Sequence, residues 1–110
     1  MSNKIIVVTL CDKLEIAHQI QDSLLQQKLI SGCQISECES TYWWNGIIEH
    51  AQEYHLEMRT REELFPEIER RIKEIHNYEV PEISYYEIKG GSHDFIEWIE
   101  KETKENKLDS

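Results

Sequence analysis

The stretch YWWNGII, residues 42–48, decides the fold that this sequence predicts. Asn45-Gly46 is typical of a two-residue β-hairpin turn, because both turn positions require a positive φ angle. After it, Ile47–Thr60 alternates apolar and charged side chains with a period of two, which indicates a strand with one buried face. Cys33–Trp44 alternates more loosely. We therefore predict a long hairpin made of the strands Cys33–Trp44 and Ile47–Thr60.

A two-residue turn also predicts the register of this hairpin. It places Trp44 opposite Ile47, and it brings apolar residues together on one side of the sheet. A bulge would shift this pairing by one residue. The apolar pairs expected on that side are Trp43 with Ile48, Ile35 with Leu56, and Cys33 with Met58.

Before the hairpin, the sequence predicts one strand and one helix. Lys4–Leu10 is nearly continuously apolar, which favours a central strand covered on both faces. Asp12 and Glu15 have the spacing of a capping box, so we expect a helix from about Lys13 to Lys28. The residues predicted to face the core from this helix are Ile16, Ala17, Ile20 and Leu24.

After the hairpin, we expect a short turn, a helix at about Pro66–His76 and a strand at Ile83–Ile88. Gly90-Gly91 indicates a turn, and Ser92 is a candidate cap for a last helix. The side chains predicted to face inward from the two helices are Ile68, Ile72 and Ile75, and then Phe95, Ile96 and Ile99. The polar segment 103–110 is expected to fray.

The resulting element order is β-α-β-β-α-β-α. It predicts an α+β domain spanning residues 1–110, with the ferredoxin-like β-α-β-β-α-β arrangement, a long hairpin and an added C-terminal helix.

Composition excludes several classes of protein. The formal net charge is −10, from 22 acidic and 12 basic residues, which disfavours binding to nucleic acid. No apolar run is long enough to span a bilayer, and no signal peptide is recognisable, so we expect a cytoplasmic address and no membrane partner. Cys11, Cys33 and Cys38 are odd in number and not spaced as CxxC, so free thiols are expected. Cys11 and Cys38 are expected to be partly exposed.

The length of the hairpin predicts an oligomer. Strands of about 14 residues at roughly 3.3 Å per residue would reach about 45 Å, whereas a compact domain of this size has a radius of gyration of about 13 Å. The tip would then expose tryptophan and isoleucine side chains, and a neighbouring subunit would cover them. The alternative is that the strands bend and that these side chains pack on their own core.

Several motifs resemble those of the CutA family of divalent-cation tolerance proteins, over residues 5–101. Tyr42–Gly46 is similar to the family's Y-x-W-E-G, and His76–Ile83 is similar to H-P-Y-E-V-P-E-I. Leu64–Pro66 and Asp94–Ile99 also fit the family pattern. The resemblance implies a homotrimer with sheets joined between subunits, similar in architecture to PII-type signalling proteins. It also implies no enzymatic activity, and a link to copper or another divalent metal as ligand.

The sequence departs from the family pattern at four positions. The family's strand cysteine aligns with Gly32, and a cysteine that some members carry at the end of the first strand aligns with Thr9. Asn77 replaces the proline of the histidine motif, and Asn45 replaces the glutamate of E-G. Because Cys33 lies one residue from the family position, its side chain is expected on the opposite face of the strand.

Three residues are candidate metal ligands. His76 lies in the histidine motif at a predicted helix end, where a histidine can also interact with the helix dipole. Cys33 opposite Met58 offers a thiol and a thioether, a pair that suits Cu(I). The competing interpretation is that the cysteine and the methionine fill core space.

A cleft between subunits is the other candidate site. The residues expected at this cleft or interface are Trp43, Trp44, Arg59, Tyr78, Glu79 and Glu82. Alternatively, Tyr78 and Pro81 only direct the chain into the fourth strand, while the charged residues form pairs between subunits. Two functions follow, a metal-tolerance trimer or a PII-like regulatory trimer that binds a small ligand or a partner protein in the cleft. A hydrolase ranks last, because no catalytic motif is present.

Overall fold

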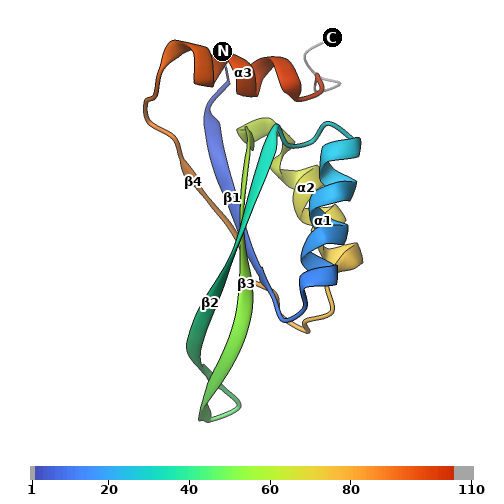
Figure 1. The fold of residues 1–110 in the computed structure, drawn as a ribbon, viewed down its shortest axis with the longest axis vertical. Helices are drawn as coiled ribbons and strands as arrows, with labels where there is room; N and C mark the ends of the chain where they lie inside the picture. Colours follow the sequence, from blue (N-terminus) through green and yellow to red (C-terminus); the bar gives the residue numbers. More distant parts are fainter. Residues whose placement is uncertain (1, 106–110) are drawn as a thin grey trace.

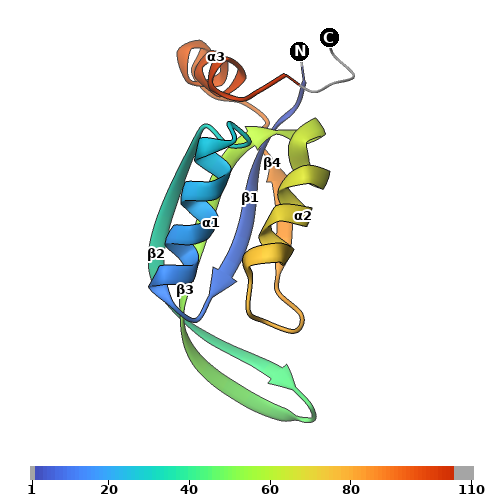
Figure 2. The same cartoon turned by 90° about the vertical axis from the view of Figure 1, so that its right-hand side faces the viewer.

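The computed structural model describes residues 2–105, which form a sheet with helices packed on one face (Figures 1 and 2). The four strands make a single antiparallel sheet in the order β2-β3-β1-β4. The elements are β1 (Lys4–Cys11), α1 (Leu14–Gln26), β2 (Gly32–Trp44), β3 (Ile47–Arg61), the 3-10 turn η1 (Glu62–Leu64), α2 (Phe65–Ile75), β4 (Ile83–Glu87) and α3 (His93–Glu102). The predicted α+β fold and the element order are confirmed.

Helices α1 and α2 lie side by side on one face of the sheet (Figures 1 and 2). The core lies between them and the sheet, and it includes Ile5, Val7, Ile20, Leu24, Leu56, Met58, Ile68 and Ile72. Strand β1 is central, as predicted, but the helices cover only one of its faces. The prediction of two covered faces was therefore wrong for the protomer, because α3 crosses the end of the sheet and not its second face.

The hairpin has the predicted turn and register. Asn45 and Gly46 have φ angles of 50° and 81°, and the ladder runs without a bulge from Gly32 opposite Arg59 to Trp44 opposite Ile47. Because a two-residue turn with positive φ matches the right-handed twist of its strands, the dipeptide fixes which side chains share each face.

Strand β3 extends well beyond β1. The ladder between them ends where Cys11 pairs with Tyr54, so residues 47–53 of β3 pair only with β2. The hairpin projects past the helices (Figure 1), and the molecule measures 47 × 27 × 23 Å. At the projecting end, Trp43 is 71% exposed and Ile47 is 58% exposed. The bent-strand alternative, in which these side chains return to their own core, was wrong.

Two local predictions were wrong. Asp12 does not cap α1, which begins at Leu14 after Lys13 and has no side-chain cap. The carboxylate of Asp12 instead accepts a hydrogen bond from Asn77 Nδ2 at 3.2 Å. Gly90-Gly91 forms no tight turn, because residues 88–92 are an irregular connection. The Ser92 cap is confirmed, since its hydroxyl accepts from Phe95 N at 3.3 Å.

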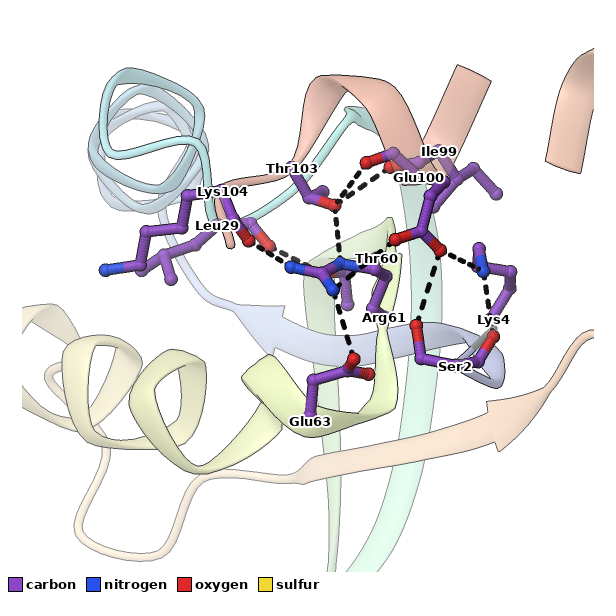
Figure 3. Close-up of polar contacts among 10 residues, drawn as sticks. All are labelled: Ser2, Lys4, Leu29, Thr60, Arg61, Glu63, Ile99, Glu100, Thr103 and Lys104. Carbon is purple, nitrogen blue, oxygen red and sulfur yellow. Dashed lines mark hydrogen bonds and ion pairs between the residues drawn. The ribbon is translucent and has the colours of Figure 1, made fainter. Parts of the chain in front are cut away.

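A buried ion-pair network attaches α3 to the end of the sheet (Figure 3). Lys4 Nζ lies 2.8 Å from Glu100 Oε1, and Arg61 Nη1 lies 3.5 Å from Glu100 Oε2. Arg61 also donates to Thr103 Oγ1 at 3.0 Å and to the Lys104 carbonyl oxygen. Both basic residues are only 4% exposed, so the network is part of the packed structure.

The same network corrects the expectation of a frayed tail. Thr103 is buried, and Lys104 N donates to the Lys28 carbonyl at 2.7 Å. Fraying was predicted from the polarity of segment 103–110 alone. Polarity did not reveal that Thr103 and Lys104 accept hydrogen bonds from the buried guanidinium of Arg61. Residues 106–110 lie outside the described part. Of the inward positions predicted on α3, only Ile99 is fully buried.

Candidate functional site

His76 follows the last residue of α2, and both of its ring nitrogens are hydrogen-bonded. Nδ1 lies 3.2 Å from the backbone N of Tyr78, and Nε2 lies 2.7 Å from the Leu10 carbonyl oxygen. An N–H can only donate, so Nδ1 is the acceptor and Nε2 carries the proton. His76 thereby joins the end of α2 to the end of β1. A metal ion could coordinate Nε2 only by displacing that proton and the Leu10 carbonyl.

Cys33 and Met58 are cross-strand partners, as the register predicted. Both side chains lie on the helix-covered face, Met58 fully buried and Cys33 half-buried. Burial raises the pKa of the Cys33 thiol to about 11, although the nearby Arg59 opposes the shift. The thiol therefore favours its protonated form, which is the weaker metal ligand. His76 is not brought to this pair.

The donor set of one protomer does not form a metal site in the part of the chain that the structure describes. No group of three or more His, Cys, Asp or Glu side chains converges there. The three candidate ligands, His76, Cys33 and Met58, belong to two separate places in the fold.

The other thiols differ from one another. Cys11 is fully buried, so the expectation of partial exposure was wrong, because β1 continues one residue further than predicted and Cys11 faces the helices. Burial, followed by the charges of Asp12 and Glu53, raises the pKa of Cys11 to about 12. Cys38 is half-buried. All three cysteines are free, as predicted.

An open cleft of about 600 Å³ lies where β3 extends past β1, between the hairpin and the connection from α2 to β4. Its walls are acidic and aromatic, and none of its lining residues is basic. The acidic and aromatic lining residues are Glu49, Glu53, Glu79, Glu82, Tyr42, Trp44 and Tyr78, and the others are Leu10, Ser40, Thr41, Asn77 and Val80.

Four of the residues expected at a cleft between subunits line this cleft within one protomer: Trp44, Tyr78, Glu79 and Glu82. The other two lie elsewhere. Trp43 neighbours Trp44 along β2, so its side chain points to the opposite face of the hairpin. Arg59 lies nearer the far end of β3, where its Nη2 donates to Gln34 Oε1 at 3.1 Å.

At the base of the cleft, the Tyr78 hydroxyl donates to Glu53 Oε2 at 2.5 Å. Burial, followed by this hydrogen bond and the charge of Glu53, raises the pKa of Tyr78. The phenol therefore remains a donor, and it connects the loop after α2 to the overhanging part of β3. Together with His76, this contact fixes the position of the cleft wall.

Sequence reasoning missed Glu53 and Tyr42 as cleft residues. Glu53 belongs to the charged set of a strand with a period of two, a pattern that predicts a solvated side chain. It is nevertheless only 6% exposed, because Tyr78 packs against it from a segment 25 residues later. The family-like motif around Tyr78 was the one sequence signal for this contact, and it did not identify Glu53 as the partner of Tyr78.

Within residues 2–105, no helix is both long and apolar enough to cross a membrane.

Comparison with known proteins gives a consistent result. Residues 5–102 match the family model described as "CutA1 divalent ion tolerance protein". The chain is 37% identical over 100 residues to a divalent-cation tolerance protein CutA of Pyrococcus horikoshii, covering 91% of this chain and 98% of that protein. It is 36% identical over 88 residues to one of Archaeoglobus fulgidus, covering 80% and 86%.

Solved structures agree. The crystal structure of CutA1 from Pyrococcus horikoshii superposes with a TM-score of 0.87 at 36% identity, covering 92% of this chain and 99% of that one. CutA1 from Oryza sativa superposes with a TM-score of 0.91 at 31% identity, covering 96% and 97%. With nearly the whole chain matched in both sequence and fold, this protein belongs to the CutA1 family of divalent ion tolerance proteins.

Proposed function

We propose that this protein is a non-enzymatic, cytoplasmic homotrimer that acts in the tolerance of divalent metal ions of the copper type, with the metal bound between subunits. Family membership supports the tolerance role. The single observation that supports an assembly is the projecting hairpin, whose exposed side chains include Trp43 at 71%, Ile47 at 58% and Ile48 at 52%. Apolar side chains gathered on an unpaired strand end are typical of surfaces that another chain covers.

Light scattering tests the assembly. We expect a mass three times that of the 13.2 kDa chain. The double variant Trp43→Ser, Ile48→Ser removes a cross-strand apolar pair at the tip and should shift the mass towards that of one chain. Leu25→Ser is the control, because Leu25 is 38% exposed but lies near the end of α1 that is farther from the hairpin turn (Figure 1). A folded wild-type protein with the mass of one chain would refute the proposal.

The sulfur ligands on β2 and β3 support the proposal of a metal site between subunits. Cys33 and Met58 offer soft sulfur ligands to Cu(I). Cys33 lies on β2, an edge strand with no strand on its outer side among residues 2–105. A second protomer can supply the further ligands that one protomer lacks.

Calorimetric titration of the metal-free protein with Cu⁺, Cu²⁺ and Zn²⁺ tests this site. We expect at least micromolar affinity for Cu⁺, weakened at least about tenfold in Cys33→Ser. His76→Ala needs a stability control, because losing its two hydrogen bonds destabilises the fold whether or not it binds metal. Binding only at millimolar concentrations, unchanged in Cys33→Ser and His76→Ala, would contradict a specific metal site.

A PII-like regulatory role, with a small ligand or partner protein in the cleft, is the second candidate. The cleft of about 600 Å³ favours it, because small-molecule sites typically have volumes of about 300–1,000 Å³. A thermal-shift screen tests it, since any ligand that binds only the folded state raises the melting temperature.

A further inference from the structure

The carboxylate of Glu53 is the most unusual group in the cleft. Glu53 is only 6% exposed, and within the described part of the chain its side chain accepts one hydrogen bond, from Tyr78 to Oε2. Among the described residues, no Lys, Arg or His pairs with it. Its second oxygen, Oε1, accepts no hydrogen bond within residues 2–105 and is not fully enclosed. Glu53 is one of the residues that line the cleft.

A buried carboxylate without a cation is unfavourable, since burial removes most of the water that would stabilise its charge. Three more carboxylates, those of Glu49, Glu79 and Glu82, line the same cleft, and no basic side chain does. The cleft thus presents several negative charges and no compensating positive charge. This charge favours a cationic ligand over a phosphate-bearing one.

The spacing of these carboxylates selects the kind of cation. A metal ion needs several ligands at one point, but no three acidic, histidine or cysteine side chains converge in residues 2–105. A ligand whose positive charges are spread along a chain can instead meet separate carboxylates.

The aromatic walls add a second criterion. Tyr42 and Trp44 line the cleft and are 41% and 40% exposed. Aromatic rings pack against methylene groups and attract ammonium groups over their faces. Both features suit an alkyl chain that carries amines better than they suit a hydrated inorganic ion.

We propose that the cleft binds an extended aliphatic polyammonium ion of the diamine and polyamine class, with one ammonium group at Glu53 Oε1, the others at the rim carboxylates, and the alkyl chain against Trp44 and Tyr42. This inference rests on the second candidate function, and it names the ligand class for that site.

Calorimetry of the full chain with spermidine at low salt tests the inference. Intrinsic tryptophan fluorescence, compared between the wild type and Trp44→Leu, is a second readout. We expect saturable binding that Glu53→Gln weakens at least about tenfold. Glu79→Gln, at an exposed rim position, should weaken spermidine binding less. Because Glu79 is exposed, this variant tests the site without changing a buried residue. Trp44→Leu should also weaken spermidine binding.

Glu39→Gln is the matched control. It removes the same charge from the same hairpin, but Glu39 is exposed and is not one of the residues that line the cleft. We expect wild-type affinity. Equal weakening by Glu39→Gln and Glu79→Gln would show attraction to the acidic surface as a whole and would overturn the site.

Two further probes separate this inference from the candidate function on which it rests. If ATP binds in the cleft and spermidine does not, the regulatory site stands and the polyammonium ligand is refuted. If neither binds and a lysine-rich peptide does, a protein partner replaces the small ligand, and the inference is again overturned. Spermidine binding that 1 mM Mg²⁺ abolishes entirely would also refute it, because the geometry excludes a chelated metal ion.

Discussion

The indole ring of Trp98 lies directly over Gly32, with its Cη2 atom 3.0 Å from the position that a Cβ on Gly32 would occupy. Trp98 comes from α3 and Gly32 begins β2, so this contact joins the C-terminal helix to the edge of the sheet. The ring of Trp98 thus occupies the space that a side chain at Gly32 would need. This explains in physical terms why the position need not carry the cysteine that the resemblance would place there.

Restoring a side chain at Gly32 should therefore destabilise the protein. We expect Gly32→Cys to lower the free energy of unfolding by about 1–2 kcal/mol, because the ring must shift. The loss should shrink in a Trp98→Leu background, as measured by a double-mutant cycle in urea. Gly90→Ala is the control, since no heavy atom lies within 4 Å of its added Cβ. Equal effects at both glycines would contradict the packing argument.

Thr9 should be replaceable by valine with a gain in stability. Its side chain is 0% exposed, and its Oγ1 is a buried polar atom without a hydrogen-bond partner among the described residues. Removing an unsatisfied buried hydroxyl should raise the free energy of unfolding by about 1 kcal/mol.

Thr60→Val provides the opposite case, and thermal unfolding of the two variants beside the wild type measures both effects. Thr60 is also 0% exposed, but its hydroxyl donates to the Leu29 carbonyl at 2.6 Å. We expect a loss of about 1–2 kcal/mol. Shifts of the same sign for Thr9→Val and Thr60→Val would show that hydrogen bonding does not decide the outcome.

Stability should fall in acid through Glu100. The hydrogen bond from Lys4 lowers the pKa of this carboxyl, and the charges of Lys4 and Arg61 act in the same direction against partial burial. A carboxyl whose pKa is lower in the folded state stabilises the fold at pH values above its unfolded-state pKa, which is about 4.3 for glutamate. This contribution is lost as pH falls through the folded-state pKa.

Glu100→Gln tests this pH dependence. Because the Glu100 side chain is 34% exposed, solvent screens its charge, and we expect a loss of only about 1 kcal/mol at pH 7. Urea midpoints of the wild type and the variant should converge as the pH falls below about 4.3. A constant gap across that range would contradict the linkage.

The three thiols should react in a fixed order. Half-buried Cys38 should label first with iodoacetamide at pH 8, followed by Cys33, whose pKa is raised to about 11. Cys11 is fully buried with a pKa raised to about 12, so it should label only in denaturant. Mass spectrometry of peptides gives the order, and native labelling of Cys11 at the rate of Cys38 would refute it.

Local sequence signals predicted the hairpin and the last helix cap well. The turn at Asn45-Gly46 depends on the φ preferences of its own two residues, and the register follows from it. Ser92 needs only the backbone N of Phe95, three positions along the chain. Interactions of this kind can be recognised from neighbouring residues.

The errors concern residues whose partners are distant in sequence. Asp12 has the spacing of a helix cap, but it bonds to Asn77. Thr103 looks like a frayed tail residue, but it accepts from buried Arg61. Glu53 looks solvated, but it is covered by Tyr78. In each case a polar side chain is placed by a contact that no local pattern encodes, and the cleft depends on one of them.

The attachment of α3 by the Arg61 network has a practical consequence for labelling. The hydroxyl of Ser2 contacts Glu100, and the carbonyl of Lys104 accepts from Arg61, so both ends of the described chain lie beside α3 (Figure 1). The hairpin turn is at the other end of the molecule. A fluorescent protein fused at either terminus would thus be attached at the end of the molecule opposite the hairpin turn. Such a fusion allows subunits to be counted by stepwise photobleaching in living cells.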